Sequence, residues 1–174
     1  NEPLMDGRIA ERIALAKQRW PRAQHYLYTD GTLLTYERLL SLFEAGLDSL
    51  VIDNYSEDLR IHPHIENILG MLEKSPHAHL RTRVEVNVIS PKELRSNRAG
   101  QAPNKQDARF LDHIRYRGMG CVAPFNQLII RPTGEVSLCC QDALGKYTLG
   151  NASEMTLDEI WYGPKLMAIR RQLM

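Results

Sequence analysis

All three cysteines of the chain lie in one short stretch, CVAPFNQLIIRPTGEVSLCC, which runs from Cys121 to Cys140. A thiolate is a soft ligand that suits zinc, copper(I) or an iron–sulfur cluster. Structural metal sites and iron–sulfur clusters usually take four protein ligands, so three cysteines form an incomplete set. Unpaired cysteines are also among the most buried residue types. Residue chemistry alone therefore favours cysteines packed in a core over a metal site.

The spacing of the cysteines follows the pattern C-x12-G-x4-C, with Cys140 directly after the last position. Two β-rich runs, 127–131 and 135–139, flank a Pro-Thr-Gly turn and predict a β-hairpin. A hairpin brings its two ends together, so Cys121 and Cys139 could reach one metal ion or cluster. In an extended strand Cys140 would point to the opposite face. The spacing is not the C-x2-C of a zinc ribbon, and no histidine follows closely.

The bulk composition is that of an ordinary globular protein, with 174 residues, 43% of them hydrophobic, and a net charge of +1. Nucleic-acid-binding proteins usually carry a basic excess, so we expect no nucleic-acid partner. No apolar run is long enough for a membrane span, and no signal peptide is visible. The few cysteines argue against a secreted disulfide scaffold. We therefore expect a cytoplasmic protein with no membrane partner, and we expect the natural chain to extend beyond both Asn1 and Met174.

Helices and strands alternate in the first half of the chain. Hydrophobic spacing predicts helices at 6–19, 35–46 and 63–74, and strands at 25–31, 50–53 and 84–90. Asp6 and Thr35 are the expected N-caps of the first two helices, and Gly46 is expected to end the second. Alternation through crossover helices predicts parallel strands and an α/β fold.

Polar residues follow the apolar strands at their carboxyl ends, where ligands bind in sheets of this kind. They are Thr29 and Asp30 after the first strand, Asp53 at the end of the second, and Asn87 in the third. Together they match what the mouth of a cofactor site requires. For any one of them alone, an ordinary loop residue is the better interpretation.

The second half of the chain is organised differently. Residues 91–109 have no apolar periodicity and predict a linker or an active-site loop, so we place a first domain at 1–107 and a second at 108–174. After the hairpin, a short strand is expected to end at Asn151. Thr156 is expected to cap a last helix that breaks at Gly163-Pro164.

The stretch from Cys121 to Met174 resembles the C-terminal SPASM or twitch domain of radical S-adenosylmethionine (SAM) enzymes. The resemblance lies in the cysteine pattern followed by GN, EIW and a basic helix containing Arg170. Upstream, NEPLMDGR resembles the family's GGEP segment, and YTDG resembles the TNG at the next strand end. AGLDSLVI resembles the following helix-to-strand junction, and SNRAGQAP a linker of some members. The resemblance implies an α/β fold, a partial (β/α) barrel of the radical SAM type followed by a small α+β twitch or SPASM-like domain with a β-hairpin.

The chain departs from the family pattern at its cysteines. It has no CxxxCxxC, the motif that binds the SAM cluster, which would fall before Asn1. The twitch type uses two early cysteines and a later CxxC pair, and that pair would fall beyond Met174. The second domain is therefore expected to be truncated, and the stretch in hand is expected to be inactive by itself.

The resemblance implies roles for seven residues. Glu2, in the GEP position, would contact the amino group of SAM; otherwise it is an exposed terminal carboxylate. Four residues at strand ends would contact its ribose and methionine parts, namely Thr29, Asp30, Asp53 and Asn87. Cys121 and Cys139 would ligate an auxiliary [4Fe-4S] cluster, in addition to the SAM cluster bound upstream.

Three further residues have two readings each. Cys140 is either a residue that transfers hydrogen near the auxiliary cluster or a packed thiol. Asp142 is either a catalytic base or part of the turn after the cysteines. Arg98 either binds substrate through its fork of donors or is a solvated loop arginine.

The family mechanism is reductive cleavage of SAM to a 5′-deoxyadenosyl radical, which removes hydrogen from a substrate. The predicted barrel is short, as in the members that act on aminocyclitols and aminoglycosides, so we expect a carbohydrate or aminocyclitol dehydrogenase or epimerase. A flavodoxin or ferredoxin would donate the electron. The alternatives are a maturase of ribosomally made peptides, a degenerate cluster-free binding module, and a zinc-binding module.

Overall fold

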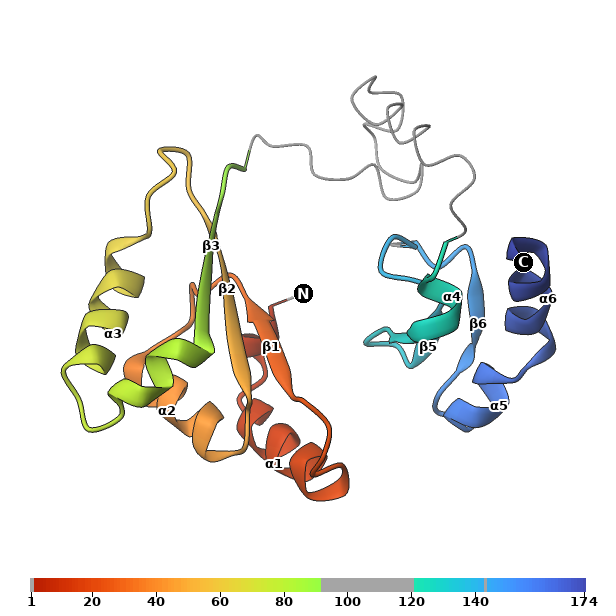
Figure 1. Cartoon of the computed structure of the whole chain (residues 1–174), viewed down its shortest axis with the longest axis horizontal. Helices are drawn as coiled ribbons and strands as arrows, with labels where there is room; N and C mark the ends of the chain where they lie inside the picture. Colours follow the sequence, from red (N-terminus) through yellow and green to blue (C-terminus); the bar gives the residue numbers. More distant parts are fainter. Residues whose placement is uncertain (1, 92–120, 143) are drawn as a thin grey trace. The chain divides into compact units, whose positions relative to one another are not determined.

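The computed structural model describes residues 2–91, 121–142 and 144–174. These residues belong to two compact units, the first ending before the longer gap and the second beginning after it (Figure 1). The predicted boundary between residues 107 and 108 lies outside the described residues and stays a prediction.

The first unit is built on a three-stranded parallel sheet with the strand order β1-β2-β3. Its strands are β1 (Tyr26–Thr29), β2 (Ser49–Tyr55) and β3 (Val84–Ile89). The register places Asp53 of β2 directly beside Asn87 of β3. The prediction of parallel strands is confirmed, because each pair is joined through a crossover helix that carries the chain back to the starting edge of the sheet.

Three α-helices and two short 3₁₀ helices complete the first unit. They are α1 (Ile9–Arg19), α2 (Tyr36–Glu44), α3 (Pro63–Glu73), η1 (Pro3–Met5) and η2 (Ala78–Arg83). Figure 1 shows α2 and α3 beside the sheet; along the chain α2 connects β1 to β2, and α3 lies in the connection from β2 to β3. Their apolar side chains form one core with Leu50 and Ile52 of β2, both fully buried.

Two expected helix caps have different outcomes. Thr35 caps α2 as predicted, with its hydroxyl accepting a hydrogen bond from the Arg38 backbone N–H. The prediction of Asp6 as the N-cap of α1 is wrong, since this helix begins at Ile9 and Arg8 is its N-cap. Asp6 instead ends η1 and accepts a hydrogen bond from the Arg8 N–H at 2.9 Å. Hydrophobic periodicity gives no signal for the turn between η1 and α1, so the predicted start of the helix was too early.

The described residues of the second unit form a small antiparallel sheet and three helices. In chain order they are α4 (Ala123–Asn126), β4 (Ile129–Ile130), β5 (Glu135–Ser137), β6 (Thr148–Asn151), α5 (Leu157–Trp161) and α6 (Pro164–Leu173). The sheet has the order β4-β5-β6. Its core is formed by Val136, Leu149, Ile160 and Leu166. The fold class is therefore mixed α/β, with a parallel sheet in the first unit and an antiparallel sheet in the second.

Local signals position the helices of the second unit as predicted. Thr156 and Glu159 form a capping box at the start of α5, with each side chain bonded to the other's backbone N–H. The break between α5 and α6 falls at Gly163-Pro164, because proline cannot continue a helix but fits its first turn. The sequence did not predict α4, which is too short to show a helical period.

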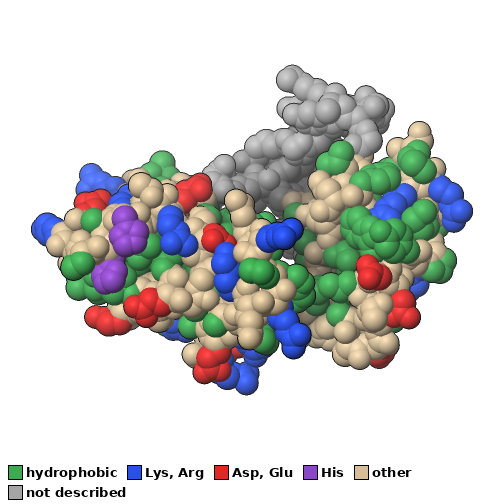
Figure 2. All heavy atoms as spheres, turned by 60° about the horizontal axis from the view of Figure 1, so that its bottom comes forward, with side chains coloured by type: hydrophobic (Ala, Val, Ile, Leu, Met, Phe, Trp, Pro, Cys, Tyr) green, Lys and Arg blue, Asp and Glu red, His purple; other side chains and the backbone are tan. Residues whose placement is uncertain are grey.

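The surface of the described residues is mixed in charge. On the face drawn in Figure 2, basic and acidic side chains are interspersed over the unit that carries the histidines. Within the described ranges, no helix has both the length and the apolar character needed to cross a bilayer.

Candidate functional site

The carboxylate of Glu2 lies at the carboxyl end of β1. Its Oε1 accepts hydrogen bonds from the Leu4 N–H at 2.8 Å and from the Thr29 hydroxyl at 2.7 Å. Its Oε2 accepts one from the Asp30 N–H at 2.8 Å. Glu2 is thus half-buried and ties η1 to the end of β1. The alternative of an exposed terminal carboxylate is wrong.

The turn after β1 holds Asp30 beside Glu2. Gly31 has φ 78°, and a Cβ there would lie 2.8 Å from side-chain carbons of Ile52 and Ile65. Only glycine fits this conformation and this space. Asp30 Oδ1 accepts a hydrogen bond from the Thr32 N–H at 2.8 Å. Hydrogen bonds from the Thr32 side chain and backbone lower the pKa of Asp30, so this carboxylate stays ionised at neutral pH.

The next strand ends supply Asp53 and Asn87. Asn87 Nδ2 donates a hydrogen bond to Asp53 Oδ1 at 3.1 Å across the β2–β3 pair. Asp53 also lines a cleft of about 300 Å³ with Glu2, Thr29 and Asp30. The structure therefore brings together the five residues predicted from the strand ends and the GEP position, which we call the strand-end site: Glu2, Thr29, Asp30, Asp53 and Asn87.

Two tyrosines that the sequence reading missed also line this cleft, Tyr28 and Tyr55. Both are exposed, at 54% and 51%, although they lie in strands. They are on the sheet face opposite the helical core, because side chains alternate along a strand and Leu27 and Ile52 pack on the core side. The alternation of side chains in β1 could have revealed Tyr28, whereas Tyr55 lies at the end of β2.

The chemistry of the strand-end site suits polar, cationic ligands. Glu2, Asp30 and Asp53 are carboxylates, and a carboxylate accepts strong hydrogen bonds from ammonium and hydroxyl groups. Within the described ranges, no set of three or more histidine, cysteine, aspartate or glutamate side chains is placed to hold a metal ion.

The three cysteines are free thiols near the solvent. Cys121 and Cys140 are exposed, and Cys139 is partly exposed. The prediction that they pack in a core is wrong, and so is the alternative of a packed Cys140. Cys121 does not lie at the end of the hairpin as expected, because α4 separates it from β4. Strand β5 ends at Ser137, so Cys139 and Cys140 lie in a turn and the opposite-face argument does not apply to them.

Asp142 holds the turn that follows the cysteines. It is 4% exposed, and its Oδ1 and Oδ2 accept hydrogen bonds from the backbone N–H groups of Lys146 and Tyr147 at 2.8 Å and 3.0 Å. Its own N–H donates to the Cys139 carbonyl oxygen at 3.1 Å. These contacts support the turn role of Asp142. A role as a base stays a prediction.

The cysteines fit an iron–sulfur ligand set in donor chemistry. Unpaired, accessible thiols can be deprotonated and can reach a cluster, whereas buried thiols would be inert. The two candidate ligands, Cys121 and Cys139, do not amount to a full set. Arg98, the predicted substrate-binding residue, lies outside the described residues.

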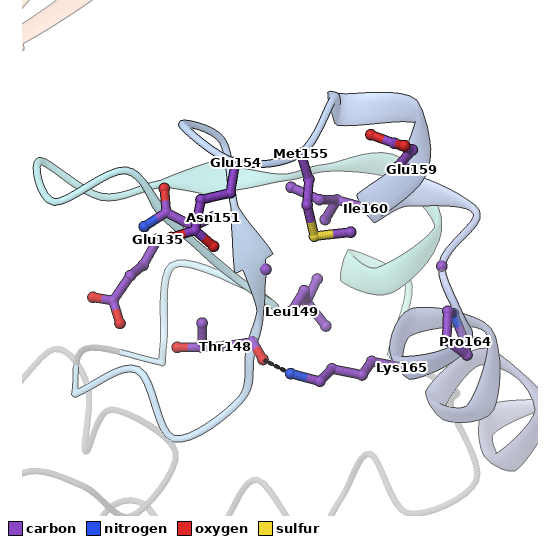
Figure 3. Close-up of a pocket in the computed structure, with 12 residues that line it drawn as sticks. Glu135, Thr148, Leu149, Asn151, Glu154, Met155, Glu159, Ile160, Pro164 and Lys165 are labelled. Carbon is purple, nitrogen blue, oxygen red and sulfur yellow. Dashed lines mark hydrogen bonds between the residues drawn. The ribbon is translucent and has the colours of Figure 1, made fainter.

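A second hollow, of about 420 Å³, lies on the second unit between β6 and the two C-terminal helices (Figure 3). Leu149, Met155 and Ile160 supply its apolar lining. Two of its polar side chains are bonded to the protein itself: the Lys165 ammonium group donates to the Thr148 carbonyl oxygen, and Glu159 accepts from Thr156. None of the cysteines lines it, so we assign the chemistry to the strand-end site and the cysteines.

Comparison with known proteins gives a family match for the second unit. Residues 121–174 match the SPASM family, described as an iron–sulfur cluster-binding domain. The whole chain is similar to the S-adenosyl-L-methionine-dependent 2-deoxy-scyllo-inosamine dehydrogenase of Niallia circulans. The two are 25% identical over 172 residues, which cover 99% of this chain and 63% of that protein.

Two solved structures share the fold. One is BtrN in complex with AdoMet and 2-DOIA, with a TM-score of 0.76 and 24% identity, covering 99% of this chain and 63% of that one. The other is selenomethionine BtrN in an open conformation, with a TM-score of 0.65 and 22% identity, covering 99% and 60%. The chain thus spans less than two thirds of the length of the relatives that it matches.

Proposed function

We propose that this chain, which belongs to the radical SAM family and has a SPASM domain at residues 121–174, is part of an enzyme that oxidises a small aminocyclitol or carbohydrate. The observation that carries the proposal is similarity to an inosamine dehydrogenase along 99% of the chain. The carboxylates of the strand-end site support it, because they suit the ammonium and hydroxyl groups of SAM. An epimerase would use the same site, but the similar protein is a dehydrogenase.

The strand-end site would hold SAM. A carboxylate has about four acceptor positions, and the protein uses two on Oε1 and one on Oε2 of Glu2. One position on Oε2 is therefore left for the amino group of SAM. Asp30, Asp53 and Asn87 would accept from or donate to ribose hydroxyls. When bound, SAM and the cluster that reduces it would supply the 5′-deoxyadenosyl radical, with an electron from a flavodoxin or ferredoxin.

The open face of the first sheet would hold the substrate. Tyr26, Tyr28 and Tyr55 present exposed rings there, and Glu85 adds an exposed carboxylate on β3. Aromatic rings can cover the apolar faces of a cyclitol, while carboxylates bind its ammonium and hydroxyl groups. These residues favour a small polar substrate over a peptide. Arg98 stays a proposed substrate contact.

The cysteines would hold the auxiliary cluster. Cys121 and Cys139 are the proposed ligands, and the accessible Cys140 is the proposed hydrogen-transfer residue. Asp142 supports the Cys139 turn in this proposal, and its action as a base is the less supported reading. The auxiliary cluster would accept an electron from the substrate radical or anchor the substrate.

Iron content tests the ligand assignment. In the whole protein, reconstituted anaerobically with iron and sulfide, Cys121→Ser and Cys139→Ser should each remove iron and visible absorbance from the second domain. Cys140→Ser is the matched control, since the same chemistry is changed at the neighbouring position, and it should keep the iron of the unaltered protein. A colourless, zinc-loaded protein would contradict the proposal, as would equal losses in all three variants.

Turnover tests two parts of the proposal, the role of the strand-end site and the substrate class. With 2-deoxy-scyllo-inosamine as the probe, Asp53→Asn should lower kcat/KM about 10–100-fold, because a hydrogen bond to a charged group contributes about 1.5–3 kcal/mol. Glu44→Gln, at the exposed end of α2, should leave kcat/KM unchanged. Absence of any oxidation of aminocyclitols by the unaltered protein would refute the substrate assignment.

A further inference from the structure

Arg170 of α6 is a buried arginine whose bonds run to other elements. Its side chain is held at 7% exposure. Its Nε donates to the Pro124 carbonyl oxygen of α4 at 2.7 Å, and its Nη1 donates to the Trp161 carbonyl oxygen at 2.9 Å. One guanidinium thus joins α4, the end of α5 and α6.

Two aromatic rings flank the same guanidinium. Its central carbon lies 4.1 Å from the Trp161 ring centre and 5.9 Å from that of Phe125, distances at which a cation is attracted to a ring. We call Arg170, Phe125 and Trp161 the arginine clamp. The clamp fixes α4 by a backbone hydrogen bond and by a ring contact.

Stability alone does not explain a buried arginine at this place. Its Nη2 is buried and has no acceptor among the described residues. A buried donor without a partner is unfavourable, so this nitrogen adds a cost to the burial of the guanidinium. The bonds of the guanidinium run to α4 and to the end of α5, and they fix where α4 lies.

That geometry matters because α4 cannot hold itself in place. It has only four residues and no side-chain N-cap. Its backbone hydrogen bonds are Phe125 N–H to Val122 O at 2.9 Å and Gln127 N–H to Ala123 O at 3.2 Å. So short a helix is unstable alone. Cys121 lies two residues before α4, so the position of its thiol depends on where α4 is held.

We propose that Arg170 is a positioning residue for Cys121, acting through the arginine clamp. The clamp itself is a property of the described contacts, whereas its consequence for an iron–sulfur cluster rests on the proposed function. Loss of the fork of donors should loosen α4 and the Cys121 thiol while the rest of the second unit stays folded.

Hydrogen exchange of the 174-residue chain without iron tests the clamp. Arg170→Met removes the charge and the donors, and Arg170→Lys keeps the charge but not the planar fork. The amides of Phe125 and Gln127 should exchange about tenfold faster or more in both variants, since local opening becomes easier. The amides of β5 and β6 should stay within about twofold of the unaltered chain. Arg171→Met and Arg171→Lys, at the exposed neighbouring position, are the matched controls and should change neither set.

Thiol labelling gives a second measurement on the same proteins. Iodoacetamide should alkylate Cys121 at least about threefold faster or slower in the Arg170 variants, because its surroundings change, while the rate at Cys140 should not change. Equal exchange and equal labelling in Arg170→Met and Arg171→Met would overturn the proposal. Faster exchange throughout β5 and β6 as well as α4 would also overturn it, since Arg170 would then be a general stabiliser.

Iron binding separates this proposal from the proposed function. After anaerobic reconstitution of the whole protein, Arg170→Lys should retain less iron in the second domain than Arg171→Lys. If the unaltered protein binds no iron, the proposed function fails while the exchange result still decides the clamp. If the unaltered protein and Arg170→Lys bind equal iron with equal absorbance spectra, the role of Arg170 toward Cys121 is refuted.

Discussion

At the residue scale, single side chains hold the strand-end site in shape. Glu2 accepts three hydrogen bonds from Leu4, Thr29 and Asp30, and so fixes the end of β1 before any ligand arrives. A charged acceptor that is already oriented loses little freedom on binding, which favours affinity. The same carboxylate therefore serves the fold and, in our proposal, SAM.

The Glu2→Gln change tests this double role. In glutamine an NH2 group replaces one of the two carboxylate oxygens of Glu2. That NH2 group would then face a donor, which is the Asp30 N–H or the Leu4 N–H and Thr29 hydroxyl. We expect the free energy of unfolding to fall by about 1–3 kcal/mol, measured by urea denaturation. Glu44→Gln, at an exposed position, should change it by less than about 0.5 kcal/mol. An unchanged midpoint for Glu2→Gln would show that these hydrogen bonds contribute nothing net.

At the element scale, turns and helix junctions place the strand ends. Gly31 directs the chain from β1 toward α2, and Asp48 ties the start of β2 to α1. Lys17 of α1 donates to both Asp48 oxygens, and the His25 backbone N–H donates to Oδ2 at 2.8 Å. At the carboxyl end of β1 the chain turns through the positive φ of Gly31, and at the start of β2 the Lys17–Asp48 ion pair holds the sheet to α1.

Two glycine-to-alanine changes should have opposite effects. Gly31→Ala places a Cβ 2.8 Å from Ile52 and Ile65 at φ 78°, and should lower the free energy of unfolding by about 1–3 kcal/mol or more. Gly70→Ala, inside α3 with no atom within 4 Å of the new Cβ, should raise it by about 0.5–1 kcal/mol. Thermal unfolding followed by circular dichroism measures both. The same sign for the two variants would refute the assigned turn geometry.

Stability should depend on pH through Asp48. The His25 backbone N–H and then the Lys17 ammonium hold the pKa of Asp48 below its usual range. A lowered pKa in the folded state stabilises the protein above the unfolded pKa of about 4, and this contribution is lost as the pH falls through the folded value. Unfolding in urea between pH 3 and pH 6 should therefore show a shallower loss of stability in Asp48→Asn. Parallel curves for the variant and the unaltered chain would contradict the assignment.

At the scale of the whole molecule, the two units divide the proposed chemistry. The strand-end site lies entirely in the first unit, and the three cysteines lie entirely in the second. Each unit has its own hydrophobic core. We therefore expect binding of SAM and retention of auxiliary iron to be separable properties.

Variants at one unit should spare the other. In the whole protein, Cys139→Ser should abolish substrate oxidation, whereas its Kd for SAM, measured by calorimetry, should stay within about threefold, because Cys139 and the strand-end site belong to different compact units, each with its own core. Glu2→Gln should do the reverse, weakening SAM binding while leaving auxiliary iron in place. Loss of SAM affinity in Cys139→Ser would show that the sites are coupled.

The sequence by itself determined the elements and the residue types of the candidate site. Alternating helices and strands predicted the parallel sheet, and strand ends predicted Thr29, Asp30, Asp53 and Asn87, since these signals are local and periodic. The tertiary structure alone decided which side chains face solvent and which elements touch. The cysteines, which residue chemistry favoured in a core, are exposed or partly exposed, and Asp142 is buried in the turn that follows them. The tyrosines of the open sheet face are exposed, and Arg170 is buried against α4. These outcomes depend on contacts between residues far apart in the chain, such as Arg170 with Pro124, which no local pattern encodes.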